Sequence, residues 1–397
     1  MAQPLLYLTY LAIIFIVGIL LSMVSGRLKI PNVLLLLAFG MFLGYLGRSG
    51  FISLDFPPVF IASIGLLALV MIVFDSSSRF KTKEFDQFSI KTLKVTFIFL
   101  ALNLVFLTVF TRYIFGIESV FLALIFSALM SGTSPDTVLS FMKQSKNSVI
   151  EFLQIESIIN TPLVVLLPFL FLDLLSEAAS SGFYQVLVSQ LIPFLEQLVS
   201  GIGSGMIVGL IFFKVMRKYY SATLSPIATV TAALITYVLA ENIGGNGVLA
   251  VTTLGLFFGN IFIKEKDELH KFSFMFTNLL EVFVFVIIGL IVDIPLTSDF
   301  FIKSSALFAL FLMIRFASLN LAFFRKEYNL KEKIFMTLSI PKGIAVAVVA
   351  VTLSGFVIPQ MKTVLDLVLV FLIYSIVIST IIAKFSKFFI RTQVVKG

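Results

Sequence analysis

Apolar stretches of about 20 residues recur along almost the whole chain, and each is long enough to cross the hydrocarbon core of a bilayer. The chain has 397 residues, of which 59% are hydrophobic and 13% are charged, with a mean hydropathy of +1.10. Inside a bilayer the backbone must satisfy its own hydrogen bonds, and apolar segments of this length do so as helices. We therefore predict an all-α polytopic membrane protein.

The apolar stretches predict about 13 transmembrane helices, and we expect residues 1–397 to form a single transmembrane unit. The predicted helices cover residues 5–24, 31–46, 58–75, 92–112, 118–142, 149–172, 189–213, 223–240, 246–263, 271–292, 303–324, 332–355 and 363–384. The first stretch lacks the basic segment and the small-residue cleavage site of a signal peptide, so we interpret it as a retained helix.

The basic residues test this division, because cytoplasmic loops of membrane proteins are enriched in lysine and arginine. With alternating topology, 23 of the 29 basic residues fall in loops on one side and four in loops on the other. This asymmetry predicts an N-terminus outside and a C-terminus in the cytoplasm. It also explains the net charge of +8 without a nucleic-acid partner.

The fifth predicted helix, residues 118–142, is interrupted by the sequence Ser-Gly-Thr-Ser-Pro-Asp-Thr at residues 131–137. Pro135 has no N–H and clashes with the carbonyl four residues earlier, so helical hydrogen bonds are lost there. Unpaired backbone at membrane depth is tolerated where it is buried in protein or lines a wet cavity. The carboxylate of Asp136 lies at the same place. Free carbonyls, hydroxyls and one acid are ligands suited to a small cation.

An internal repeat is indicated by two matches that lie seven predicted helices apart. LAFGMFLG at residues 37–44 resembles TTLGLFFG at residues 252–259, and the break at Pro135 corresponds to a break at Pro341. An odd offset inverts the second half relative to the first. Two inverted halves with Pro-broken helices are typical of secondary transporters, whose site lies where the breaks meet.

Ionisable residues inside membrane helices are costly, and each is a functional hypothesis by default. Six are interpreted as lying in the interior of the bilayer: Asp136, Glu156, Glu196, Glu281, Arg315 and Lys342. Arginine stays charged, so Arg315 needs an acid, and we expect a structural ion pair with Glu156.

The other intramembrane charges keep two interpretations each. Lys342 either binds carbonyls freed by Pro341, supporting the broken helix, or acts directly in transport. Glu196 and Glu281 either line an ion path or have only a packing role, and Glu196 has the further option of facing a partner subunit or interfacial water.

The sixth predicted helix carries Glu156, Ser157, Asn160 and Thr161 at helical spacing. Ser157 and Thr161 are one turn apart and so share a ridge of one face, as do Glu156 and Asn160. The plainer interpretation is that these polar groups hold helices together. We favour a face that points at the break in the fifth helix.

At these positions the chain resembles the cation:proton antiporter superfamily, specifically its sodium/proton exchanger branch, over nearly its whole length. The family sequence GTDP corresponds here to Gly-Thr-Ser-Pro at 132–135, and ESxxND corresponds to Glu-Ser-Ile-Ile-Asn-Thr at 156–161. The segment Asn-Gly-Val-Leu-Ala at 246–250, Arg315 and Pro-Lys-Gly at 341–343 match further family motifs.

Two acids of the family pattern are absent from this chain. Ser134 replaces the aspartate of the GTDP motif, and Thr161 replaces the aspartate that follows Asn160. Asp136 lies two positions beyond Ser134, and we expect it to act as the titrating carboxylate instead. The expected ligands of a monovalent cation are Asp136, Thr133, Ser157 and Thr161, with Ser134 and Asn160 beside them.

The resemblance also implies an assembly and a way of moving. It implies a homodimer in the plasma membrane, in contact with lipids, with a core bundle that slides like an elevator against a dimerisation and gating bundle. We expect the core at residues 92–172 and 303–384, and the gating bundle at residues 5–75 and 189–292.

We therefore predict a secondary active Na⁺ or K⁺/proton antiporter, electroneutral and serving pH homeostasis, with no cofactor besides the transported ions. The alternatives are a carrier of another solute or an anion, and a homologue that does not exchange ions. An enzyme is not expected, because the sequence offers no nucleophile–base pair or cofactor motif. It has no cysteine, and its only histidine, His270, lies in a polar loop.

The substitution Asp136→Asn is expected to abolish cation-driven proton movement while leaving a folded protein, because it removes the carboxylate for which cation and proton compete. Exchange rates in liposomes and size-exclusion profiles measure the two properties. Wild-type exchange rates in this variant would exclude Asp136 as the titrating group.

Overall fold

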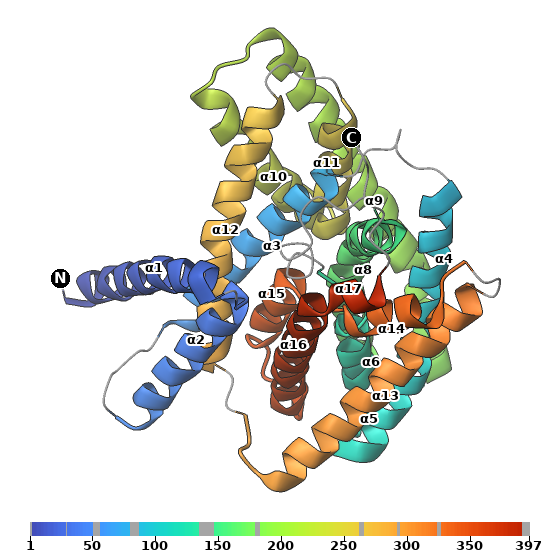
Figure 1. Ribbon diagram of the computed structural model, residues 1–397. Coiled ribbons are helices and arrows are strands. Elements are labelled where there is room, and N and C mark those ends of the chain that lie inside the picture. Colours follow the sequence, from blue (N-terminus) through green and yellow to red (C-terminus); the bar gives the residue numbers. More distant parts are fainter. Residues whose placement is uncertain are drawn as a thin grey trace.

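The computed structural model describes residues 2–28, 30–50, 56–79, 87–134, 147–178, 183–261, 266–291, 294–323 and 327–390 (Figure 1). Within these ranges nine helical segments are long and apolar enough to cross a membrane. They comprise α1 (Ala2–Leu28), α3 (Pro58–Ser78), α4 (Gln87–Leu102) continuing into α5 (Thr108–Phe115), α8 (Ser148–Ala178), α9 (Phe183–Lys218), α10 (Leu224–Asn242), α12 (Lys266–Ile291), α13 (Ser298–Ala322) and α16 (Met361–Lys384).

Four apolar helices among the described residues are shorter: α2 (Asn32–Arg48), α6 (Val120–Leu129), α11 (Gly247–Asn260) and α15 (Ile344–Leu353). Two further short helices are α14 (Leu330–Leu338) and α17 (Ser386–Phe389). The all-α membrane class predicted from the sequence is confirmed over this part of the chain. The count of 13 crossings and the inverted repeat stay predictions.

For description the helices are divided into a first group, which contains α1, α2, α3, α9, α10, α11 and α12, and a second group, which contains α4, α5, α6, α8, α13, α14, α15 and α16. Contacts between the groups are made by α15 with α3 and α12, and by α8 with α3, α9 and α11. In the first group α2 lies on α12, and α11 lies between α3, α9 and α10. In the second group α4 packs on α13 and α8, and α6 packs on α8 and α16. Figure 1 shows α15 and α16 near the centre of the view, with α2 and α12 to one side and α13 and α5 to the other.

Small residues let the helices of the first group approach closely, as is usual where helices pack inside lipid. A Cβ on Gly44 of α2 would lie 2.7 Å from the Leu290 carbonyl oxygen of α12. A Cβ on Gly255 of α11 would lie 2.9 Å from the Phe74 carbonyl oxygen of α3. These glycines belong to the sequence match between residues 37–44 and 252–259, so both act as packing contacts.

One helix is interrupted, and another ends within the described residues, where Gly and Pro residues predicted breaks. After α6 ends at Leu129, the chain is non-helical through the described residues up to Ser134. The other break separates α14 from α15 at residues 339–343. Pro135 and Asp136, and the remainder of the predicted fifth helix to residue 142, lie outside the described residues.

A third irregularity is a π-helical turn, Asn103–Leu107, which joins α4 to α5. Its first residue, Asn103, is fully buried, and its Nδ2 lies 3.2 Å from the Ser131 hydroxyl in the break after α6. A π-turn inside a helix commonly marks a functional region. Here it turns a buried amide toward the interrupted backbone.

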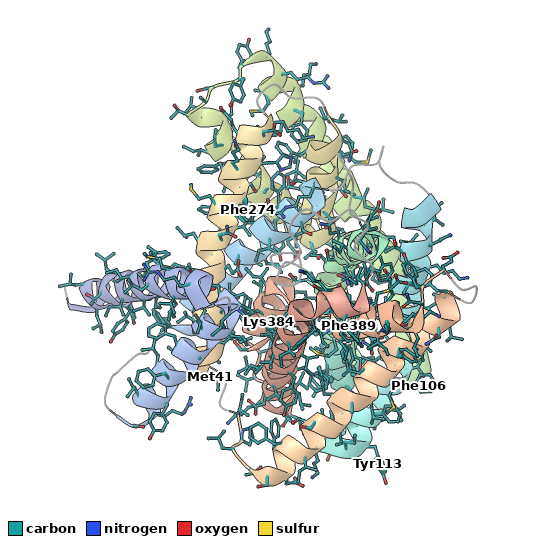
Figure 2. The ribbon with its side chains drawn as sticks, viewed as in Figure 1. Met41, Phe106, Tyr113, Phe274, Lys384 and Phe389 are labelled. Carbon is teal, nitrogen blue, oxygen red and sulfur yellow. The ribbon has the colours of Figure 1, made fainter. Side chains whose placement is uncertain are left out.

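The outer surface is apolar, as expected for a protein surrounded by acyl chains. Phe106 and Tyr113 project away from the bundle (Figure 2), and their exposed fractions are 47% and 89%. Exposed apolar side chains also run along α1, α9 and α10. A soluble protein rarely exposes so much contiguous apolar surface.

Candidate functional site

The two breaks cross and hold each other through backbone contacts. The Ser134 N–H donates a hydrogen bond to the Pro341 carbonyl at 2.9 Å. Gly343 lies directly against the Ser134 side chain, and a Cβ at Gly343 would collide with it. Pro341 therefore contributes a hydrogen-bond acceptor. Because Gly343 has no side chain, the two non-helical segments can approach each other closely.

Lys342 lies at the crossing, and its side chain binds the backbone of the opposite break. Its ammonium donates to the Met130 carbonyl at 2.6 Å and to the Gly132 carbonyl at 2.7 Å. The ammonium also lies 4.5 Å from the centre of the Phe311 ring. The sequence analysis considered a tether to carbonyls freed by Pro341. The carbonyls that the structure gives to Lys342 belong instead to the break after α6, because the crossing brings them within reach.

Glu156 of α8 and Arg315 of α13 are both fully buried and form a two-pronged ion pair. Arg315 Nη1 donates to Glu156 Oε1 and Nη2 donates to Oε2, each at 2.5 Å. The guanidinium carbon also lies 4.7 Å from the centre of the Phe99 ring and 5.9 Å from that of Phe152. Burying two charges is costly, and the two parallel charge-assisted hydrogen bonds offset part of that cost. The pair links α8 to α13 beside the crossing.

A cavity of about 310 Å³ opens at the crossing. It is lined by α3, α8, α12, the start of α15 and the break after α6. Five residues expected from the sequence to form the ion site line it together: Thr133, Ser134, Ser157, Asn160 and Thr161. Its rim includes the exposed Gln154 and Phe274, so it opens toward the surface.

Hydrogen bonds orient the oxygens of this cavity. The Thr161 hydroxyl donates to the Ser157 carbonyl at 2.6 Å, and the Ser157 hydroxyl donates to the Gln154 carbonyl at 2.8 Å. Each hydroxyl proton is thereby used within α8, which leaves the oxygen lone pairs to accept. Asn160 donates from Nδ2 to the Thr133 hydroxyl at 2.7 Å, and its buried Oδ1 has no hydrogen-bond partner among the described residues. Such oxygens are suited to coordinate a cation.

The charged residues of the cavity differ from those expected. Glu281 lines it, whereas Glu196 is exposed on α9 and does not. Asp75 also lines the cavity, with 5% of its surface exposed, together with Arg79. The sequence analysis took Asp75 as the end of a span. In the structure α3 continues to Ser78, so the polar residues 75–78 after Phe74 belong to the helix. This polar run at the end of an apolar helix was the sequence feature that could have indicated a cavity here.

A second cavity of about 720 Å³ lies toward the opposite ends of the same helices and includes Asp173, Glu241 and Thr352 in its lining. The order is the same on three helices. Ile72, Val164 and Val346 line the first cavity, and Leu66, Phe169 and Thr352 line the second.

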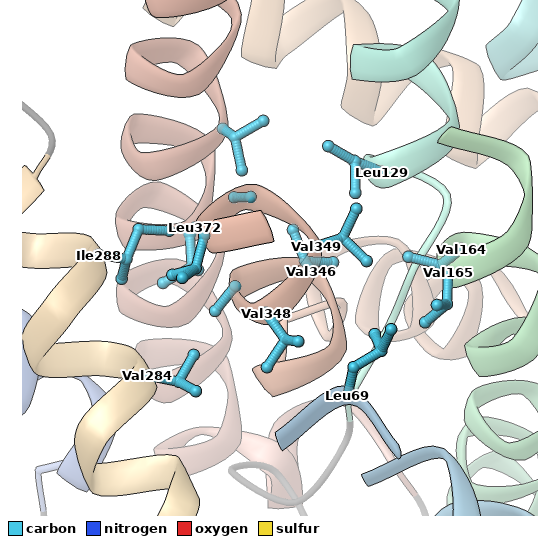
Figure 3. Packing of buried hydrophobic residues seen from close by; sticks show 14 of the residues in the cluster. Leu69, Leu129, Val164, Val165, Val284, Ile288, Val346, Val348, Val349 and Leu372 are labelled. Carbon is cyan, nitrogen blue, oxygen red and sulfur yellow. The ribbon is translucent and has the colours of Figure 1, made fainter. Parts of the chain in front are cut away.

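Fully buried aliphatic side chains pack together on the parts of α3, α8 and α15 that lie between the residues lining the two cavities. Figure 3 shows Leu69, Val165, Val348 and Val349 among them. Along α15 this apolar layer spans six residues, or about 9 Å at the helical rise. A layer of this kind separates the polar crossing from the second cavity.

Comparison with known proteins gives a family match and relatives. Residues 11–387 match the family described as sodium/hydrogen exchanger, transmembrane. The chain is 26% identical over 381 residues to Na(+)/H(+) antiporter 1 of Methanocaldococcus jannaschii, covering 87% of this chain and 82% of that protein. It is 26% identical over 287 residues to the K(+)/H(+) antiporter NhaP of Alkalimonas amylolytica, covering 71% of this chain and 49% of that one. The chain thus spans about half the length of the second relative.

The fold is similar to that of the sodium proton antiporter MjNhaP1 from Methanocaldococcus jannaschii at pH 8, with a TM-score of 0.80. The alignment covers 97% of this chain and 98% of the other, at 18% sequence identity. At this identity the likeness establishes the fold.

The substitution Glu156→Gln is expected to lower thermal stability sharply, because it leaves the Arg315 guanidinium buried without its counter-charge. Removing one partner of a buried pair costs about 3–5 kcal/mol. The melting temperature of the purified protein measures this effect.

A matched control is Glu327→Gln, which breaks an exposed pair with Lys91 whose atoms are 2.8 Å apart. Exposed pairs contribute about 0–1 kcal/mol, so this variant should melt close to the wild type. Equal losses in the two variants would contradict a stabilising role specific to the buried pair.

Proposed function

Because the chain belongs to the sodium/hydrogen exchanger family of transmembrane proteins, we propose that it is a secondary active antiporter that exchanges Na⁺ or K⁺ for protons. The observation that supports this proposal is the crossing of the two breaks beside a cavity whose lining contains hydroxyl and amide oxygens. Its curated relatives are named as Na⁺/H⁺ and K⁺/H⁺ antiporters. An activity as an enzyme does not fit this family.

The proposed cation ligands are the oxygens of Thr133, Ser157, Asn160 and Thr161, together with the carboxylate of Asp136. Neutral oxygens and one carboxylate give a site with a single negative charge, which suits a monovalent cation. Either a cation or a proton neutralises that charge. The loaded or protonated site crosses the membrane, whereas an empty anionic site would carry an unpaired charge through a low-dielectric region.

Access to the site is proposed to alternate between the two cavities. The first cavity opens at Arg79, Phe274 and Gln154, and the apolar layer separates the crossing from the second cavity. By the distribution of basic residues in the loops, the first opening faces the cytoplasm and the C-terminus lies there too. This arrangement corresponds to an inward-facing state.

The proposed movement is an elevator-like displacement of the second helix group, which contains the crossing, against the first. The meeting line along α3, α8, α12 and α15 is then the sliding surface, and its apolar side chains allow displacement without breaking ion pairs. A homodimer in the plasma membrane would hold the first group in place. The Glu156–Arg315 pair lies inside the second group and would move with it as a rigid tie.

Exchange is proposed to be electroneutral, with one cation for one proton. One carboxylate at the crossing holds either ion but not both. Asp75 does not add a net charge to this cycle, because Arg79 neutralises it at 2.6 Å. The Lys342 ammonium stays bound to two carbonyl oxygens of the opposite break and does not alternate with the ions, so its charge is the same in both halves of the cycle.

The proposal is tested with purified protein in liposomes that contain a pH-sensitive dye. An imposed Na⁺ or K⁺ gradient should change the internal pH, because cation influx is coupled to proton efflux. Protein-free liposomes give the leak rate. A constant internal pH with both cations would leave the alternatives, a carrier of another solute or a homologue that does not exchange ions.

The substitution Thr161→Asp addresses the missing family aspartate. It adds a carboxylate to the cavity, which Asp75 and Glu281 already line, near the proposed ligand Asp136. Two nearby carboxylates do not both stay ionised, so one takes up a proton more readily. The site should then hold two protons per cation. The expected result is a pH optimum shifted upward and an exchange rate that responds to membrane voltage, measured in liposomes with a potassium diffusion potential.

The isosteric Thr161→Asn serves as the control without the charge, and it should show neither effect. If Thr161→Asp instead gained robust electroneutral exchange that the natural protein lacks, the natural protein would be a homologue that has lost exchange.

A further inference from the structure

Asp75 and Arg79 form an ion pair at the mouth of the first cavity, and the proposed function does not use it. The two residues are one turn apart on α3, and Arg79 Nη2 lies 2.6 Å from Asp75 Oδ2. The two side chains differ in exposure, which is 7% for Asp75 and 45% for Arg79. The acid is thus fixed in the protein, whereas the guanidinium reaches water.

The pair stands where two cavities adjoin. Asp75 and Arg79 line the 310 Å³ cavity at the crossing and also a neighbouring cavity of about 520 Å³. The neighbouring cavity is further lined by Lys266, His270 and Lys271 and by the acid Asp267, at the more basic end of the bundle. An ion that moves between this end and the crossing therefore passes the Asp75 carboxylate.

Arg79 also extends across this passage. Its guanidinium carbon lies 5.1 Å from the centre of the Phe274 ring on α12. Phe274 lines both cavities and is exposed. The side chain therefore starts on α3, binds an acid there, and ends over an aromatic ring of the facing helix.

A buried carboxylate requires a counter-charge, and the position next to Asp75 is the place where an arriving cation would bind. Arg79 occupies that position as a cation tethered to the same helix. Because its guanidinium is half in water, it regains hydration when it is displaced, so the replacement of one positive charge by another costs little. Tethering keeps the competitor at a high local concentration, so an ion bound at Asp75 is readily expelled.

We propose that Asp75 is an access site for Na⁺ or K⁺ at the cytoplasmic mouth, and that Arg79 is its tethered counter-ion, which speeds the release of the passing ion. This inference rests on the proposed antiport. Asp75 is the group that touches the ion, and Arg79 is a positioning residue that acts through it.

The test is Arg79→Gln in everted vesicles, whose cytoplasmic side faces the assay medium. Without its competitor, the ion should bind more tightly and leave more slowly, so KM for the cation and kcat should both fall. A partly exposed ion pair at the upper end of the usual range changes a binding constant by a factor of about three to five. KM and kcat should each fall by about that factor. Arg79→Lys keeps the charge and should restore both constants.

A double variant separates this role from a structural one. Asp75→Asn should raise KM, and adding Arg79→Gln to it should change nothing further, because Arg79 acts only through Asp75. The matched control is Lys303→Gln. It breaks an i,i+4 ion pair in which Lys303 Nζ lies 2.7 Å from Asp299 Oδ2, and neither residue lines either cavity. It should leave KM and kcat unchanged. Unchanged constants in Arg79→Gln, or an equal effect of Arg79→Gln in the Asp75→Asn background, would overturn the proposal.

A binding measurement decides the assignment independently of transport. Na⁺ or K⁺ added to purified protein should raise the melting temperature at lower concentrations in Arg79→Gln than in the wild type. If the wild type shows no cation-driven exchange, the proposed antiport fails, and this melting shift still supports or overturns the assignment of Arg79. No difference in the concentration dependence would overturn it.

Discussion

Carbonyl groups that a helix break leaves free have no water to bind at the centre of a bilayer, and each would cost several kcal/mol without a partner. The chain meets this requirement with two side chains, of which Asn160 donates from Nδ2 to the Ser131 carbonyl at 3.4 Å. The Lys342 ammonium binds the Met130 and Gly132 carbonyls, and its own break accepts the Ser134 N–H through Pro341. Each interrupted helix therefore supplies what the other lacks. The crossing, the cavity and the placement of the oxygens all depend on this exchange.

The Glu156–Arg315 pair is the second costly element of the structure. Its acid, Glu156, lies on α8, the helix that also carries the proposed ligands Ser157, Asn160 and Thr161. Glu156 lies one residue before Ser157, so the pair fixes the rotation of α8. With Glu156 directed to Arg315, Ser157, Asn160 and Thr161 all line the cavity. Moving this charge pair would disturb the site more than moving a neutral contact. A buried ion pair is weak evidence for stability in itself, but it is well suited to fix an orientation.

Polar groups are distributed unevenly along the passage. Charged side chains line the basic end, hydroxyl and amide oxygens line the cavity at the crossing together with Glu281 and beside Lys342, and an aliphatic layer from α3, α8 and α15 follows. On the proposed path, a cation would meet the Asp75 carboxylate first, would then lose water to hydroxyl and amide oxygens, and would then meet a barrier without polar atoms. In this order the attraction between the cation and the carboxylate acts where water still screens it. The contacts of the cation with hydroxyl and amide oxygens would form where water is excluded. The absence of the two family aspartates places more of the binding on neutral oxygens.

The sequence by itself determined the membrane class, the two breaks and the residues around them, because apolar length, proline and buried charge have strong local costs. It also indicated that Arg315 requires an acid, and Glu156 was the acid at a matching depth. It did not reveal Asp75, since a carboxylate at the end of an apolar run reads as the end of a helix. The difference between Glu281 at the cavity and Glu196 on the surface was likewise beyond it. Those assignments, and the carbonyls that Lys342 binds, depend on which faces of distant helices meet, and only tertiary packing decides that.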